Sequence, residues 1–199
     1  MAGLTYLGID VLRLPFIRAT SLGHEVLHNW WGNGVMVDYA RGNWSEGLTT
    51  FMADYAYKED ESASAASEMR LAWLRDVAAL DSGQDRPLRE FTSRTHGSDQ
   101  VVGYHKAAML FVMLRDAIGG DTFDQGLRRF WSEHRGSIAS WEDLRTAFER
   151  AYRKRGIEFT TGVRFQSVTQ NESGVVVTLE NGATIEADLL LVAVGRGPA

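Results

Sequence analysis

The spacing of the apolar residues changes near residue 150, and this change constrains the fold more than any other feature of the sequence. Before it, apolar residues recur three and four positions apart, as along one face of a helix. After it, they alternate with polar residues in short runs, as in strands. All 6 Trp and all 6 Met lie at or before Trp141, whereas the later residues are rich in Val and Thr. We therefore predict an α+β protein, with a helical region at 1–150 and a β-rich region at 151–199.

The first region contains five segments with an amphipathic helical pattern. They are 45–59, 66–80, 103–118, 122–134 and 140–154. Ser45 is predicted to cap the first of them, and Ser140 with Asp143 has the spacing of a capping box. Gly119 and Gly120 are typical of the end of a helix. The stretch 84–100, with Pro87 and scattered Gly, Ser and Thr, is predicted as a loop.

The last region is predicted to form a β meander, that is, consecutive strands joined by short turns. Its strand candidates are 157–162, 164–170, 175–180, 183–187 and 189–195. Asn181 and Gly182 form a dipeptide that favours a two-residue hairpin turn. We expect antiparallel pairing across that turn.

Composition and charge exclude several classes of protein and site. The chain has no Cys, so any metal must be held by His and carboxylate side chains. The net charge is -5, and no run of Lys and Arg forms a stripe that would bind phosphates, so we do not expect a nucleic-acid-binding protein. There is no apolar run of membrane-spanning length and no secretory leader pattern, so we expect a cytoplasmic protein without a membrane span.

The segment HEVLH at 24–28 is the strongest functional signal in the chain. On a helix, His24 and His28 project from one face, where both imidazoles can bind one Zn²⁺. Glu25 points elsewhere on the helix but can reach a water molecule that zinc polarises and take its proton. This arrangement is typical of metal-assisted peptide hydrolysis.

The short motif alone also fits a helix with two surface or capping histidines. Glu46 favours the metal site, because it begins the next apolar helix after a loop long enough to turn the chain back. Tyr104, on a later helix, offers a phenol that can stabilise an oxyanion. Asp38 and Asp54 are both candidates to orient a ligand imidazole through its second nitrogen.

Three motifs in the same order resemble the catalytic domain of the gluzincin aminopeptidases, the membrane alanyl aminopeptidase family. They are HEVLHNWWGN at 24–33, GNWSEGLTTFMADY at 42–55 and GYHKAAMLFVMLRDAIGGDTFDQGLRRFW at 103–131. The resemblance implies a thermolysin-like, mainly helical fold and a peptide substrate. It also implies one Zn²⁺ held by His24, His28 and Glu46, with Glu25 as general base and Tyr104 steadying the tetrahedral intermediate.

The chain departs from the family pattern at its start. The family binds the amino group of its substrate with a Glu-containing segment upstream of the zinc helix, and residues 1–23 contain no Glu. We therefore expect a catalytic region that begins after that segment, which leaves aminopeptidase and endopeptidase activity both open. Between His28 and Glu46 the chain has one residue fewer than is usual in the family, which a loop can absorb.

Residues 151–199 resemble a different family, the flavin-dependent pyridine nucleotide–disulfide oxidoreductases of the dihydrolipoyl dehydrogenase type. There the matching stretch connects the NAD-binding and FAD-binding domains and ends in a motif matched by Gly195, Arg196 and Pro198. Because the chain has no Cys and no G-x-G-x-x-G loop after a strand, we expect neither FAD nor NAD.

Three hypotheses about function follow. The first is a zinc-dependent metallopeptidase of the aminopeptidase type, acting on peptides. The second is a truncated or chimeric zinc-binding fragment without catalytic competence, because two partial resemblances meet near 149–155. The third is a residual flavin or nicotinamide oxidoreductase based on the last region. The sequence carries no indication of the oligomeric state.

Overall fold

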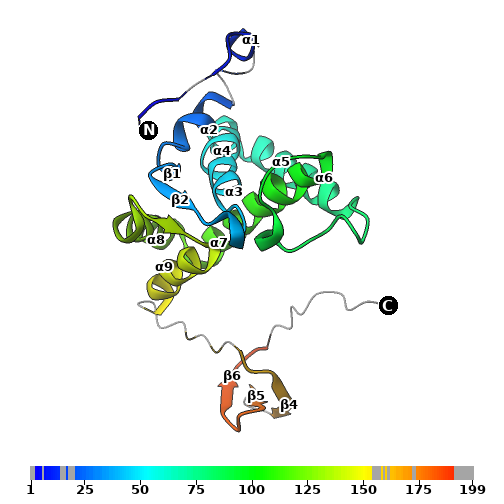
Figure 1. Ribbon diagram of the computed structural model, residues 1–199. Coiled ribbons are helices and arrows are strands. Elements are labelled where there is room, and N and C mark those ends of the chain that lie inside the picture. Colours follow the sequence, from blue (N-terminus) through cyan, green and yellow to red (C-terminus); the bar gives the residue numbers. More distant parts are fainter. Residues whose placement is uncertain are drawn as a thin grey trace. The chain divides into compact units, whose positions relative to one another are not determined.

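The computed structural model describes residues 3–5, 7–13, 17, 21–153, 158, 160, 162–171 and 174–190. The chain divides into two compact units, Met1–Ile157 and Glu158–Ala199. The first unit is mainly helical and the second is built from strands (Figure 1). This is the α+β fold class that the change in spacing predicts. Within the described residues, no helix is long and apolar enough to cross a membrane.

Helices dominate the described part of the first unit. In chain order its elements are α1 (Ile9–Leu12), α2 (Ser21–Leu27), β1 (Trp31–Gly32), β2 (Val35–Val37), η2 (Tyr39–Arg41), α3 (Ser45–Thr50), η3 (Phe51–Tyr55), α4 (Ala56–Glu61), α5 (Ala63–Ala78), η4 (Leu88–Glu90), α6 (Gly97–Gln100), η5 (Val101–Lys106), α7 (Ala107–Ile118), α8 (Gly120–His134), β3 (Ile138–Ala139) and α9 (Trp141–Arg153). Strands β1, β2 and β3 form a small parallel sheet in that order.

Two long helices of this unit each contain a π-helical segment. Elements α3, η3 and α4 form one continuous helix, and α6, η5 and α7 form another. The segments η3 and η5 are π-helical, so their turns are wider than those of an α-helix. The first helix confirms the prediction at 45–59. The second begins at Gly97, inside a stretch predicted as a loop, and that part of the prediction is wrong.

The helix ends show which capping predictions were correct. Ser140 and Asp143 form the predicted capping box: the Ser140 amide donates to Asp143 Oδ2 at 2.8 Å, and the Asp143 amide donates to Ser140 Oγ at 3.3 Å. Gly119 has a φ of 81° and ends α7 as predicted. Ser45, however, is already the first residue of α3. The N-cap position is occupied by Trp44, and Asn43, one residue before it, accepts a hydrogen bond from the Ser45 amide through its Oδ1 at 3.0 Å.

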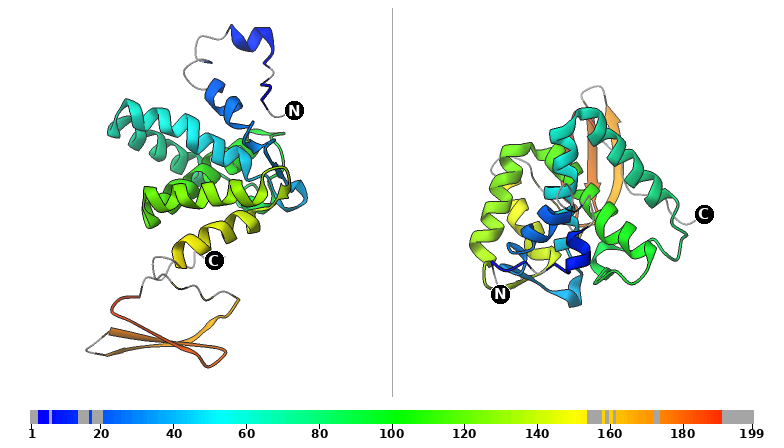
Figure 2. Two further views of the ribbon diagram at one scale, coloured as in Figure 1. Left: turned by 90° about the vertical axis from the view of Figure 1, so that its left-hand side faces the viewer. Right: turned by 90° about the horizontal axis from the view of Figure 1, so that it is seen from above.

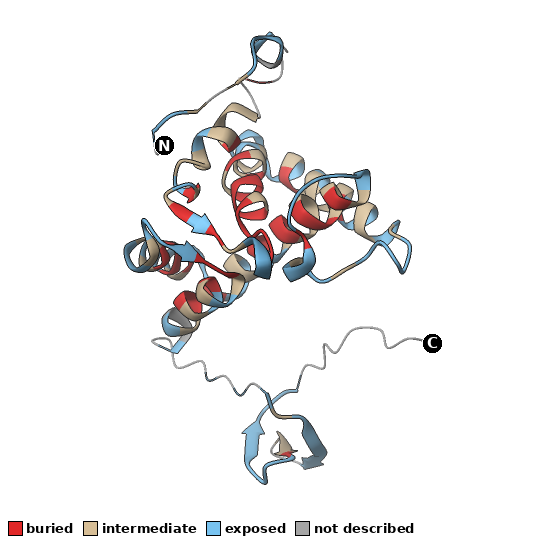
Figure 3. Cartoon of the chain, viewed as in Figure 1, coloured by how far each residue is buried: buried red, intermediate tan, exposed pale blue. Residues whose placement is uncertain are grey.

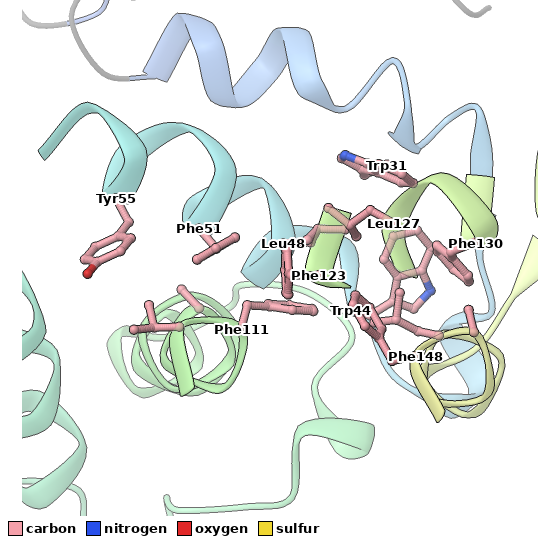
Figure 4. Packing of buried hydrophobic residues seen from close by; sticks show 14 of the residues in the cluster. Trp31, Trp44, Leu48, Phe51, Tyr55, Phe111, Phe123, Leu127, Phe130 and Phe148 are labelled. Atoms are coloured by element: carbon pink, nitrogen blue, oxygen red, sulfur yellow. The ribbon is translucent and has the colours of Figure 1, made fainter. Parts of the chain in front are cut away.

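The core of the first unit lies where its long helices pack on one another. Helix α3 packs on α7, α7 on α8, and α8 on α9 (Figure 2). The buried residues concentrate along α3, α7 and the inner faces of α8 and α9 (Figure 3). Aromatic rings fill the space between these helices (Figure 4). Trp44 lies beside Phe130 with ring centroids 5.1 Å apart, and its Nε1 donates to the carbonyl of Ala139 at 2.8 Å.

The second unit contains one antiparallel sheet, in the order β4 (Phe165–Asn171), β5 (Gly174–Leu179) and β6 (Thr184–Ala187). This is the predicted meander for 164–187. The turn between β5 and β6 uses Gly182 with a φ of 83°, and Asn181 Oδ1 accepts from the Ala183 amide at 3.0 Å. The predicted strands at 157–162 and 189–195 lie largely outside the described residues. Strands β4 and β6 are exposed throughout.

Gly47 allows α3 and α7 to approach closely, and we expect Gly47→Ala to destabilise the protein. A Cβ at this position would overlap the Cβ of Ala107. Overpacking of this kind costs about 1–3 kcal/mol, which exceeds the gain of up to about 1 kcal/mol in helix propensity. Urea unfolding should therefore show a net loss of about 1–2 kcal/mol. Gly97→Ala is the matched control, because a Cβ there meets nothing within 4 Å. Equal stability of the two variants would contradict the close approach.

Candidate metal centre

The three predicted metal ligands come together from two helices. His24 lies in α2, His28 follows the end of α2, and Glu46 lies in the first turn of α3. The His28 amide donates to the His24 carbonyl at 3.3 Å, which continues the helical turn and keeps both imidazoles on one side. Glu46 Oε2 lies 3.2 Å from His24 Nε2 and 3.4 Å from His28 Nε2. One donor atom from each residue lies within 4.8 Å of the other two.

The second nitrogen of each imidazole has its own partner, which fixes the orientation of the ring. His24 Nδ1 lies 3.0 Å from Asp54 Oδ2, and His28 Nδ1 lies 2.9 Å from the carbonyl of Trp31. A proton on each Nδ1 leaves Nε2 free to coordinate a cation. Of the two candidate carboxylates, Asp54 therefore contacts the ligand imidazole. Asp38 lies instead 3.6 Å from Arg41.

The charges of this cluster favour a cation at the point that the three donors share. Burial lowers the pKa of His24, but hydrogen bonds and charge from Asp54 and Glu46 outweigh burial and raise that pKa to about 9. Burial raises the pKa of Glu46, but the two imidazoles outweigh it and lower that pKa to about 2. Glu46 is therefore an anion over the whole physiological pH range, and both rings lie in a negative potential.

Small side chains leave room for these rings. Gly32 has a φ of 119°, and a Cβ there would lie 3.3 Å from His28 Nδ1. Thr49 is one turn after Glu46, and its hydroxyl lies 3.1 Å from His24 Nε2 while it donates to the carbonyl of Ser45 at 2.9 Å. Sequence reasoning missed Thr49, although its spacing of three residues from Glu46 places both on one helix face.

Glu25 and Tyr104 line the same pocket as the three ligands, a cavity of about 660 Å³. Within the described residues, nothing donates a hydrogen bond to the Glu25 carboxylate or pairs with it. Tyr104 lies in the π-helical segment η5, and its ring stacks on His24 with centroids 6.0 Å apart. Burial, together with the nearby Glu46 carboxylate, raises the pKa of the Tyr104 phenol well above its usual value. The phenol therefore keeps its proton and can donate a hydrogen bond into the pocket.

The donor set fits a zinc ion. Two imidazole nitrogens and one carboxylate oxygen are ligands that Zn²⁺ prefers, and three protein ligands are typical of a catalytic zinc site, in which a further position stays open. The orienting contacts of both imidazoles are those usual for metal-bound histidines. Glu46, as a half-buried anion, compensates part of the cation's charge.

Comparison with known proteins shows two family matches along the chain. Residues 18–164 match the peptidase family M1 domain. Residues 133–199 match the pyridine nucleotide-disulphide oxidoreductase family. Over 50 residues, a quarter of this chain, the sequence is 48% identical to the epsilon subunit of the NADH-dependent phenylglyoxylate dehydrogenase of Aromatoleum evansii, of which the match covers 12%.

The relatives include two bacterial aminopeptidases. Aminopeptidase N of Haemophilus influenzae is 31% identical over 135 residues, which are 65% of this chain and 15% of that protein. Aminopeptidase N of Escherichia coli is 28% identical over 137 residues, again 65% of this chain and 15% of the relative. The chain thus spans about 15% of the length of these relatives.

A similar arrangement occurs among solved structures. An M1 zinc metallopeptidase variant from Deinococcus radiodurans, bound to a Tyr-Ser-Ala substrate, superimposes with a TM-score of 0.57 and 25% sequence identity. That superposition covers 75% of this chain and 32% of the other.

Proposed function

Because this chain belongs to the peptidase M1 family, we propose that its first unit is the zinc-binding part of a metallopeptidase of the aminopeptidase type. The observation that carries this proposal is the convergence of His24, His28 and Glu46 in a pocket that Glu25 and Tyr104 also line. The aminopeptidase relatives support the choice of peptides as substrate.

We assign each residue a role that fits its position. His24, His28 and Glu46 hold the zinc ion. When bound, zinc supplies a Lewis acid that polarises a peptide carbonyl and lowers the pKa of water. Glu25, whose carboxylate has no partner within the described residues, takes the proton of the attacking water and passes it to the leaving amine. Tyr104 donates a hydrogen bond to the oxyanion that develops on the carbonyl oxygen.

We propose that the oxidoreductase-like residues, at about 151–199, form a separate region that has no part in this hydrolysis. No Cys is present to form a redox disulfide, and the sequence has no G-x-G-x-x-G loop for a dinucleotide. The described residues that line the pocket with the metal ligands belong to the first unit.

Zinc content and chelator sensitivity of the soluble full chain test the proposal. We expect one Zn²⁺ per chain, hydrolysis of an aminoacyl anilide, loss of both with a chelator, and recovery on adding zinc. Glu46→Ala should lose the metal, whereas Glu90→Ala, at an exposed position away from the pocket, should keep it. Absence of bound zinc, or hydrolysis that persists in chelator, would overturn the proposal. Bound zinc without hydrolysis would favour the alternative of a zinc-binding fragment that is not catalytic.

Cleavage of a peptide with an acetylated amino terminus separates the two kinds of peptidase. An aminopeptidase requires the free amino group, so the acetylated peptide should resist while the unmodified one is cut. If the acetylated peptide were cut internally, the proposal of zinc-dependent hydrolysis would stand, but the protein would be an endopeptidase and not an aminopeptidase.

A further inference from the structure

Arg94 introduces a positive charge into a pocket whose other permanent charges are negative. It lies in the segment between η4 and α6 and lines the same cavity as His24 and Tyr104. Of the residues that line this cavity, Arg94 is the one Arg or Lys, whereas Glu25, Glu46 and Asp54 are the carboxylates. Its side chain is exposed and therefore accessible to a ligand.

The backbone next to Arg94 is firmly held. Asp99 is buried, and its Oδ2 accepts hydrogen bonds from the amides of Thr95 and His96, both at 2.7 Å. The Thr95 hydroxyl donates to the same oxygen at 2.5 Å. Because these bonds lower the pKa of Asp99 well below its usual value, the carboxylate stays charged and the contacts persist at neutral pH. The backbone that follows Arg94 is thereby restrained.

Two nearby cations, Arg86 and Lys106, are paired with carboxylates. Arg86 forms an ion pair with Asp99, and Lys106 lies 2.5 Å from Asp85. In the described part of the chain, no carboxylate lies within ion-pair distance of Arg94. The guanidinium is therefore available to an anion that enters the cavity.

We propose that Arg94 binds a carboxylate of the substrate, and so selects peptides that carry one within reach of the metal centre. This inference rests on the proposed peptidase function. The planar guanidinium can donate two parallel hydrogen bonds to a carboxylate, a geometry that an ammonium group does not offer. The carboxylate can come from the free carboxyl terminus of a short peptide or from an Asp or Glu side chain. Both sources present the same group to Arg94.

Direct binding measures this selection without depending on turnover. The zinc-loaded full chain carrying Glu25→Gln is titrated calorimetrically with three peptides of equal length. One has a free carboxyl terminus, one is its neutral carboxamide, and one is a carboxamide with a Glu side chain. Adding Arg94→Ala to the Glu25→Gln variant should raise the Kd of one or both carboxylate-bearing peptides about fivefold. The Kd of the neutral carboxamide should stay unchanged. The affected peptide identifies the source of the carboxylate.

Arg89→Ala is the matched control, because Arg89 is an exposed arginine of the same stretch that lines a different cavity. It should change none of the three affinities. Arg94→Glu should reverse the selection and favour a carboxamide peptide with a Lys side chain. Equal weakening of all three peptides by Arg94→Ala, no weakening of any, or no binding at all would overturn the inference. Hydrolysis of an aminoacyl anilide that has no carboxylate is measured separately. This assay tests the proposed function independently of any role of Arg94.

Discussion

Replacing Glu25 with Gln is expected to reduce peptide hydrolysis by about 10²–10⁴-fold and to leave the zinc content unchanged. Glutamine has nearly the same shape as glutamate but cannot take a proton from water at neutral pH. Glu25 lies outside the group of donor atoms that converge near Glu46, so the metal should stay bound. The measurement is kcat for an aminoacyl anilide, together with zinc per chain by atomic absorption.

Glu61→Gln controls for the loss of a carboxylate elsewhere. Glu61 is exposed at the end of α4, where it pairs with Lys58 at 2.6 Å, and its substitution should leave kcat unchanged. If Glu25→Gln lost its zinc, Glu25 would be part of the metal site rather than the proton acceptor. An unchanged kcat with zinc in place would remove Glu25 from the mechanism altogether.

Tyr104→Phe should lower kcat by about 10²–10³-fold, the usual effect of losing one hydrogen-bond donor to an oxyanion. Phenylalanine keeps the ring that stacks on His24 and lies 6.0 Å from the Phe91 ring, so the fold and the zinc content should persist. Because burial raises the pKa of the Tyr104 phenol, the hydroxyl remains a donor across the neutral and mildly alkaline range. The expected loss is therefore the same under neutral and mildly alkaline conditions.

Tyr57→Phe is a suitable comparison, because Tyr57 lies on α4, outside the residues that line the pocket. It should change neither kcat nor zinc binding. A rise in KM alone for Tyr104→Phe, with kcat intact, would mean that the hydroxyl acts on substrate binding and not on the developing charge. Loss of zinc would indicate a structural role for the ring.

Local spacing explains why the ligand cluster could be predicted from the sequence. His24 and His28 are separated by one helical turn, and Glu46 begins the next apolar helix, so pairing the two helices brings all three together. The loop between the helices is one residue shorter than in the resembled family, but the helix ends still meet. Only the fold determines which carboxylate reaches His24. The sequence therefore left Asp38 and Asp54 as equal candidates.

The errors of the prediction arise where a helix begins with a different local hydrogen bond from the one expected. Ser45 has the right side chain for a helix cap, but it is the first residue of α3, and its amide donates to Asn43 Oδ1. The stretch 84–100 has loop-forming residues, yet the buried Asp99 organises a helical start at Gly97. No motif or spacing in the sequence indicates a role for Arg94, because its proposed role depends on the pocket that it lines in the fold.

The π-helical segment η3 determines which residues share a face of the long helix. Along a regular α-helix, Asp54 would be rotated by roughly 80° from Glu46, eight positions earlier. The wider turns of η3 reduce the rotation per residue and return Asp54 to the side of Glu46, where it contacts His24.

The π-helical segment therefore accommodates one residue more than a regular α-helix would need between Glu46 and Asp54. In a chain shortened by one residue within 51–53, a regular α-helix would place Asp54 seven positions after Glu46, a rotation of roughly 700°, and therefore on nearly the same side. In an alignment, a gap of one residue at η3 would therefore be compatible with an intact arrangement of Glu46, Asp54 and His24.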